Sequence, residues 1–157
     1  MKRFFSLTLA LALILGLTAC GGKENDASPL YSTSHVEAMA KAGAFSEELE
    51  ELDADTAFAL YKLADYGLAR EDLTDCAVLR SAGATCEEGA VLVFTGADKA
   101  ETAQGALKDY VQSQIEANTD YRPAEIPKLE EALVDRRGET LLLAVANDLD
   151  AVKKTVG

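Results

Sequence analysis

The chain has 157 residues, of which 48% are hydrophobic and 27% are charged. This length favours one domain, and this composition excludes an intrinsically disordered chain. The 15 basic and 27 acidic residues give a formal net charge of −12, and without a cluster of cations to meet a phosphate backbone the chain is not expected to bind nucleic acid.

The first 20 residues have the features of a lipoprotein export signal. Lys2 and Arg3 form a positive start, and residues 4–17 form an apolar run of 14 residues. A permanent bilayer span needs about 20 apolar residues, so this run is short for one. The sequence Leu-Thr-Ala-Cys at residues 17–20, at the end of this run, resembles the lipobox of bacterial lipoproteins. The resemblance implies that the Cys20 thiol is alkylated with diacylglycerol and that a signal peptidase cuts between Ala19 and Cys20.

These features predict three segments. Residues 1–19 are expected to be a signal peptide, residues 20–34 a lipidated flexible tether rich in Gly, Ser and polar side chains, and residues 35–157 a single domain. Acyl chains on Cys20 would hold the mature protein at the extracytoplasmic face of the cell membrane, and this covalent lipid is the only cofactor expected. The alternatives are an uncleaved anchor or a plain secretory signal with an incidental cysteine.

The first part of the domain is predicted to be helical. Ser34 and Glu37 have the spacing of a capping box, which favours a helix start, and Gly43 is expected to end or bend that helix. Phe45, Leu49 and Leu52 then recur at helical intervals. The predicted helical stretches begin at residue 34 and cover residues 46–51 and 53–66.

The periodicity then changes to that of strands. Two strands are predicted over residues 73–81 and 89–95, with a turn near Gly83, and two more over 133–136 and 140–146. Helices are predicted over residues 98–118, 124–131 and 148–155. Together these elements predict an α+β fold: N-terminal helices followed by two strand–strand–helix units, with a mainly antiparallel four-stranded sheet covered by helices on one face.

Several short stretches occur in an order that resembles a known family. They include Ala-Gly-Ala-Phe at 42–45, Leu-Glu-Glu-Leu-Asp at 49–53, Tyr-Gly-Leu at 66–68, Thr-Cys-Glu-Glu at 85–88, Tyr-Arg-Pro at 121–123 and Asn-Asp at 147–148. From about Val36 to Val152 the chain resembles the Gram-positive lipoprotein family known as domain of unknown function 4358. The chain departs from it at Gly89, where the family usually has a branched apolar residue, and at the turn over 138–140. The resemblance implies a location and a fold, and no chemistry.

The histidine, cysteine and aspartate residues that could act in catalysis or metal binding lack the partner residues that such sites require. His35, the only histidine, is interpreted as a solvated residue of a helix start. Cys76 and Cys86 lie too far apart in the predicted hairpin for a disulfide to be favoured, and free thiols are expected instead. Asp53 and Asp55 do not open a calcium loop, because the sixth position lacks the glycine that an EF-hand requires.

Four residues are weak candidates for ligand binding. Arg136 and Arg137, at a predicted hairpin tip, could receive a carboxylate or phosphate, although charges that keep a sheet edge soluble are the commoner explanation. Tyr121 and Glu88 complete the set. No phosphate-binding glycine loop, nucleophile elbow or pair of catalytic carboxylates at a recognisable spacing is present in the sequence.

The sequence therefore favours a non-enzymatic, membrane-anchored extracytoplasmic lipoprotein that acts as a binding or accessory module. An envelope protein or a small molecule is its expected partner, besides the membrane itself. The alternative is an enzyme or enzyme subunit that acts on cell-envelope material with Glu87 or Glu88 as acid or base. A structural spacer is a third hypothesis.

Overall fold

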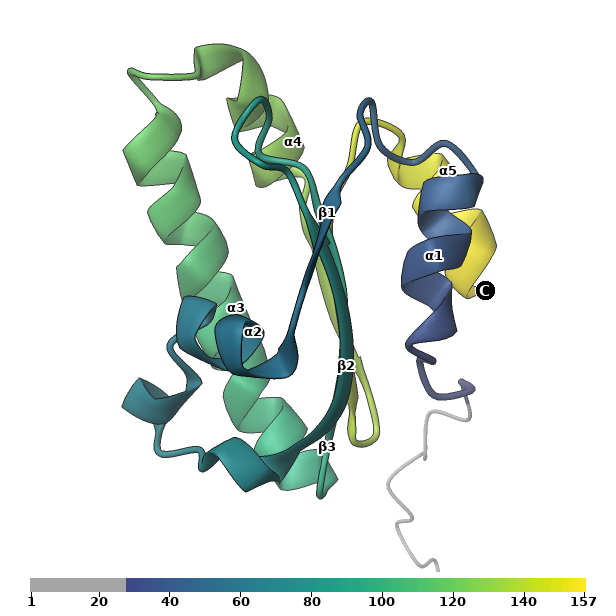
Figure 1. Ribbon diagram of the computed structural model, residues 1–157, viewed down its shortest axis with the longest axis vertical. Helices are drawn as coiled ribbons and strands as arrows, with labels where there is room; N and C mark the ends of the chain where they lie inside the picture. The colour runs from purple at the N-terminus through teal and green to yellow at the C-terminus, as the bar shows by residue number, and fades with distance from the viewer. Residues whose placement is uncertain (1–27) are drawn as a thin grey trace, which may run out of the picture.

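The structure is a computed structural model that describes residues 28–157. Ala19, Cys20, the predicted signal peptide and most of the predicted tether lie outside the described residues. The described chain forms three layers, in which helices cover both faces of one antiparallel sheet (Figure 1). No helix in residues 28–157 has the length and apolarity needed to cross a bilayer.

The sheet has five strands in the order β1-β2-β3-β5-β4, and every neighbouring pair is antiparallel. In the second hairpin, formed by β4 and β5, it is β5 that lies next to β3 of the first hairpin. The strand bounds are β1 (Glu50–Leu52), β2 (Leu73–Arg80), β3 (Glu88–Phe94), β4 (Leu133–Arg137) and β5 (Thr140–Val145).

The α+β class is confirmed, but the prediction of four strands is wrong. The stretch predicted to be helical over residues 46–51 is a bend followed by β1, a three-residue edge strand that pairs with the end of β2. Leu52 packs on the sheet through strand pairing with Val78, and spacing that fits a helix occurs here by chance. Only tertiary pairing distinguishes so short a strand from a helical turn.

Helices cover the two faces unequally. The long α3 (Ala97–Asn118), α2 (Ala54–Leu60) and a following 3-10 turn η1 (Leu63–Tyr66) cover one face, while α1 (Ser34–Lys41) and α5 (Leu149–Val156) cover the other (Figure 1). Two further 3-10 turns and one short helix complete the chain: η2 (Arg70–Asp72), η3 (Pro123–Glu125) and α4 (Ile126–Glu130). The two strand–strand–helix units thus place their helices on opposite faces.

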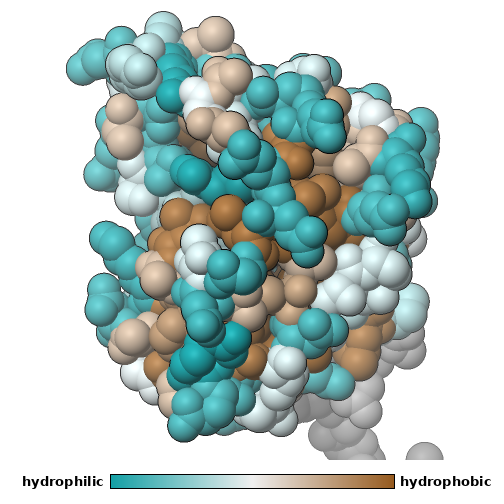
Figure 2. All heavy atoms as spheres, viewed as in Figure 1, coloured by the Kyte–Doolittle hydropathy of each residue, from teal (hydrophilic) through white to brown (hydrophobic). Residues whose placement is uncertain are grey.

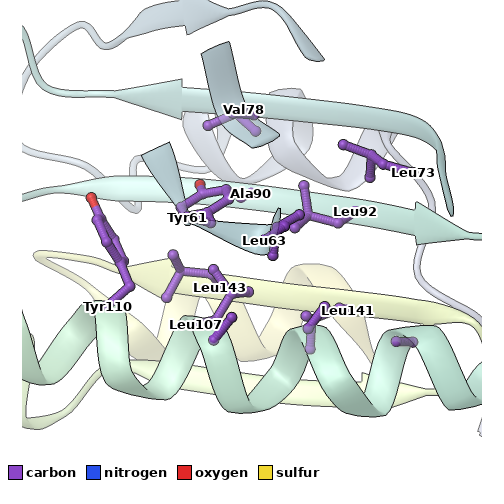
Figure 3. Packing of buried hydrophobic residues seen from close by; sticks show 14 of the residues in the cluster. Tyr61, Leu63, Leu73, Val78, Ala90, Leu92, Leu107, Tyr110, Leu141 and Leu143 are labelled. Carbon is purple, nitrogen blue, oxygen red and sulfur yellow. The ribbon is translucent and has the colours of Figure 1, made fainter. Parts of the chain in front are cut away.

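The expectation that one face of the sheet is covered is therefore wrong. Alternate residues of β5 point into separate cores: Leu141 and Leu143 pack with Leu107 of α3 (Figure 3), and Leu142 packs with Val36 of α1. All five of these side chains are buried. The uninterrupted apolar runs in β3 and β5 are the sequence signal for this arrangement, because a strand buried on both faces cannot alternate with polar residues.

The helix predicted over residues 53–66 is interrupted. Asp53 caps α2 by accepting a hydrogen bond from the Thr56 amide at 2.8 Å, but Lys62 adopts φ of 52° and the chain continues as η1. Gly67, with φ of 79°, ends that turn, as predicted for a helix C-terminus. At the start of α1, Thr33 occupies the N-cap without a side-chain bond, so the capping box predicted for Ser34 and Glu37 does not form.

The last residues of the predicted tether pack on the domain. The ring of Tyr31 is 4% exposed, its amide donates to Thr140 Oγ1 at 2.9 Å, and its hydroxyl donates to Asp135. The packed part of the chain therefore begins before residue 35.

In the view of Figure 2, hydrophobic residues form a band across the middle of the molecule, where Figure 1 places β1, and hydrophilic residues surround it.

Candidate functional site

A small polar pocket lies at the end of the sheet where β2 turns into β3. The hairpin, the last turns of α3 and the loop before η3 form its walls. Its volume of about 180 Å³ would hold about six water molecules, and is well below the ~300–1,000 Å³ typical of drug-sized ligands. It therefore suits a small ligand or the end group of a larger one. The side chains that define its chemistry are Arg80, Cys86, Glu88, Gln114, Asn118 and Arg122.

Glu88, the first residue of β3, is held in the wall of this pocket by three donors. Its Oε1 accepts from the Tyr61 hydroxyl at 2.5 Å, and its Oε2 accepts from the Tyr110 hydroxyl at 2.7 Å and from Arg80 Nε at 3.2 Å. The residue is 2% exposed. Burial raises the pKa of the Glu88 carboxyl, while the hydrogen bonds and the Arg80 charge act in the opposite direction.

The two tyrosines that bind Glu88 support each other. Their rings meet edge to face, with centroids 5.1 Å apart and planes at 82° (Figure 3). Burial, and after it the Glu88 charge, raises the pKa of both phenols, so both remain protonated donors at physiological pH. Arg80 also donates to the Tyr110 hydroxyl at 3.2 Å, so the guanidinium lies in a defined position at the pocket.

The opposite wall carries a second guanidinium and two amides. Arg122 donates through Nη1 to the Thr85 carbonyl at 3.1 Å and makes no ion pair within residues 28–157. Asn118 is only 8% exposed; its amide nitrogen donates to the Gln114 carbonyl at 2.7 Å, while its Oδ1 has no partner in the described chain and keeps contact with solvent. A side-chain oxygen that reaches solvent and has no protein partner is free to accept a hydrogen bond from water or from a ligand.

The thiol of Cys86 also lines the pocket. Burial raises its pKa, and the nearby Glu125 carboxylate adds to the effect, whereas Arg122 and Arg80 lower it. A raised pKa keeps the sulfur in the thiol form, which is a poor nucleophile. Cys86 is therefore a lining group in this pocket.

Glu87 also borders the pocket, but its carboxylate is engaged in a fully buried clamp. Its carboxylate accepts from the amide and the hydroxyl of Ser46, each at 2.7 Å, and from Lys128 Nζ at 2.7 Å. Lys128 also pairs with Glu125 at 3.2 Å. Since Glu87 is 0% exposed, this clamp fixes the loop before β1 and α4 against the hairpin that carries the pocket.

The structure brings two of the four predicted binding candidates to this end of the sheet. Glu88 lies in the pocket wall, and the exposed ring of Tyr121 lies 5.1 Å from the guanidinium carbon of Arg122. Arg136 and Arg137 lie at the other end, because Arg137 pairs with Thr140 and Thr140 pairs with Val93, five residues along β3 from Glu88. The four residues thus do not form one site.

Arg137 has a structural role instead. It donates to the carbonyls of Pro29, Val156 and Gly157 at 3.0–3.2 Å, and its guanidinium stacks 4.3 Å from the ring centroid of Tyr31. These contacts join the segment before α1 to the end of α5. Arg136 donates to the Gly138 carbonyl, and its Nε is buried without a partner in residues 28–157.

The remaining predictions concern single residues. His35 lies in the first turn of α1, as predicted, but it is half-buried: its ring meets the Tyr31 ring edge to face, and its Nδ1 accepts from the Ser32 amide. Cys76 and Cys86 are free thiols. The part of the chain from residue 28 onward holds no group of three or more His, Cys, Asp or Glu side chains placed to bind a metal ion.

Sequence reasoning missed Arg80, Gln114, Asn118 and Arg122. An available signal was the charge pair across the hairpin, since Arg80 lies opposite Glu88. A tight turn near Gly83 predicts Cys86 opposite about Ser81, whereas the Ser81 amide donates to the Glu87 carbonyl. That shift of one residue moves every side chain of the strand to the other face, so Arg80 and Glu88 were not recognised as neighbours.

Comparison with known proteins identifies a domain and no activity. A family model described as a domain of unknown function (DUF4358) matches residues 46–146. No curated protein and no solved structure matches the chain significantly. The matched stretch runs from the loop before β1 to the residue after β5 and contains every residue of the pocket.

Proposed function

We propose, from the premise that this chain belongs to the family of the domain of unknown function (DUF4358), that it is a membrane-anchored extracytoplasmic lipoprotein whose domain binds a small polar ligand. The pocket at the β2–β3 hairpin is the proposed ligand site. The observation that carries the proposal is the set of side chains in this pocket, where a guanidinium without an ion-pair partner in residues 28–157 faces a buried amide.

Binding is favoured over catalysis because the carboxylates that an enzyme would need are engaged. Glu87 is fully buried against Ser46 and Lys128, with no oxygen directed to solvent. Glu88 borders the pocket, but three donors hold it as an acceptor. Glu88, held in this way, stabilises the wall of the pocket and positions the Arg80 guanidinium.

One observation favours the enzyme as a second candidate. Glu88 combines a raised pKa with a place in a pocket, which is typical of a catalytic acid. Such an enzyme would release soluble fragments from isolated cell-wall material and lose this activity in Glu88→Gln. A binding module releases no fragments in either form.

The anchor is tested with a Cys20→Ala variant. We expect the wild-type chain to incorporate labelled palmitate and to sediment with membranes, because two or more acyl chains hold a protein there stably. The Cys20→Ala chain should incorporate no label and should keep the mass of the precursor. Cys86→Ala, which removes a thiol of the folded domain, is the matched control and should behave as wild type. Equal labelling and sedimentation of the Cys20→Ala chain would contradict the anchor.

A further inference from the structure

We propose that the pocket between the β2–β3 hairpin and the end of α3 binds a small oxyanion, a carboxylate or phosphate group, through Arg122 and Arg80. The group is either a free ion or the end of a larger molecule. This inference rests on the proposed binding function and names the class of ligand.

The first argument is charge. Arg80 is balanced by Glu88, and Lys128 is balanced by Glu87 and Glu125. Arg122 makes no such pair in the described chain, although the protein as a whole carries a net charge of −12. The two carboxylates that line the pocket, Glu87 and Glu88, are paired with Lys128 and Arg80. The Arg122 guanidinium, which has no carboxylate partner in residues 28–157, is therefore available to an anion from outside.

The second argument is the number of free donors. A guanidinium has five N–H donors in a planar fork. Arg122 uses Nη1 for the Thr85 carbonyl, and Arg80 uses Nε for Glu88 and Tyr110. Apart from a contact of Arg122 with the Cys86 thiol, no other side-chain hydrogen bond of either arginine is present within residues 28–157. The remaining donors of two guanidiniums that line one pocket match the lone pairs of a planar or tetrahedral oxyanion.

A third argument comes from Asn118. This side chain lines the pocket and is mostly buried, and its Oδ1, which has no partner in the described chain, keeps contact with solvent and can accept a hydrogen bond from a ligand. The amide of Gln114 lines the same wall. These amides would contact a hydroxyl, amino or protonated acid group beside the oxyanion, so ligands with such a group should bind more tightly than the bare ion.

The arginines are also held in place before a ligand arrives. Glu88 and Tyr110 fix Arg80, and Thr85 and the Tyr121 ring fix Arg122. Ligand binding therefore loses little side-chain entropy, which favours affinity. The volume of about 180 Å³ admits a carboxylate or phosphate with a few additional atoms and is too small for a nucleotide.

The test is a ligand titration of the lipid-anchored chain in detergent. The thermal unfolding midpoint of the protein is measured at each ligand concentration. The probes are sodium phosphate, sodium acetate and the dipeptide Ala-Ala with a free or an amidated C-terminus, at constant ionic strength set with sodium chloride. We expect saturable stabilisation by at least one oxyanion probe. Arg122→Gln should weaken its apparent affinity about tenfold or more, as expected for loss of a charge-assisted hydrogen bond.

Two further variants make the titration specific. Arg122→Lys keeps the charge and loses the fork, so its affinity should lie between those of wild type and Arg122→Gln. Arg136→Gln removes an arginine at the opposite end of the sheet and should leave the affinity unchanged. Circular dichroism of each variant verifies the fold. Stabilisation by free but not amidated Ala-Ala would identify a terminal carboxylate as the source, and stabilisation by phosphate alone would identify a phosphate.

The outcomes separate this inference from the proposed function. Equal stabilisation of wild type and Arg122→Gln would overturn the oxyanion site. Stabilisation only by the amidated dipeptide, lost in Arg122→Gln, would overturn the ligand class and leave the binding function in place. No stabilisation by any probe would overturn both.

Discussion

Replacing Lys128 with Met is expected to lower the free energy of unfolding by about 3–5 kcal/mol, the largest effect of any single polar substitution considered. The substitution leaves the Glu87 carboxylate, which is 0% exposed, with only the amide and hydroxyl of Ser46 as partners. A buried carboxylate without its cation keeps the full cost of its desolvation. Chemical denaturation of the wild type and variant at neutral pH measures the difference.

The control and the double variant make this prediction specific. Lys108→Met removes the same charge from an exposed position of α3 and should change the stability by less than about 0.5 kcal/mol. The double variant Glu87→Gln with Lys128→Met should be less destabilised than the sum of the single variants, by about 0.5–3 kcal/mol. Strict additivity would mean that the two side chains do not interact in solution.

Replacing Glu88 with Gln is expected to have an effect that depends on pH in a defined direction. At pH 4, where folded Glu88 is protonated, the variant should be less stable than wild type by about 1–3 kcal/mol, because an amide nitrogen cannot accept a hydrogen bond, whereas the hydroxyl oxygen of a carboxylic acid can. Burial raises the pKa of Glu88 in the folded protein. The contribution of such a group is fully present below its unfolded pKa and is lost as the pH rises through the folded pKa. The gap between wild type and variant should therefore narrow from pH 4 toward neutral pH, by about 1.4 kcal/mol for each unit by which the pKa is raised.

Asp53→Asn provides a control of opposite sign. Hydrogen bonds from Thr56, first its amide and then its hydroxyl, lower the pKa of Asp53. A group with a lowered folded pKa contributes stability above its unfolded pKa and loses it as the pH falls. The stability gap of Asp53→Asn should thus widen as the pH rises through the acidic range, while that of Glu88→Gln narrows. If both gaps changed in the same direction, the burial of Glu88 would not control its titration.

The sequence predicted most of the regular elements for a local physical reason. The two hairpins and α3 are long enough for their periodicity to be unambiguous, and Asp148 caps α5 as its position indicated. The family resemblance was confirmed over residues 46–146. These features depend on neighbours in the sequence, which is why a single chain reveals them.

The elements that were missed depend on contacts between distant residues. β1 has three residues and exists through its pairing with β2. Tyr31 is buried by Thr140 and Asp135, more than 100 positions away. The pocket likewise joins Arg80 and Glu88 of the hairpin to Asn118 and Arg122 after α3. Long-range contacts of this kind leave no local periodicity, although the register of a hairpin could have placed Arg80 beside Glu88.

Of the residues predicted from the sequence to bind a ligand, some lie at the pocket and others have a structural role. Glu88, a predicted binding candidate and a possible acid or base, does border the pocket. Arg136 and Arg137 were chosen because adjacent cations are unusual on an acidic chain, but Arg137 holds Pro29, Val156 and Gly157 together. The unusual charge of Arg137 therefore marked a residue with several partners. Only the structure shows that these partners are carbonyls of the chain itself and not a ligand.

The most direct test of the binding function is to map where a ligand contacts the protein. In a nitrogen-15 NMR titration of the labelled, lipid-anchored chain in detergent with sodium phosphate or acetate, we expect saturable backbone shifts confined to residues 81–86 and 114–122, which flank the pocket. The same titration of Arg122→Gln should leave these signals in place. Shifts centred on Arg136 and Arg137, or on the groove between α1 and β2 lined by Val36 and Leu79, would contradict the assignment of the ligand site to this pocket.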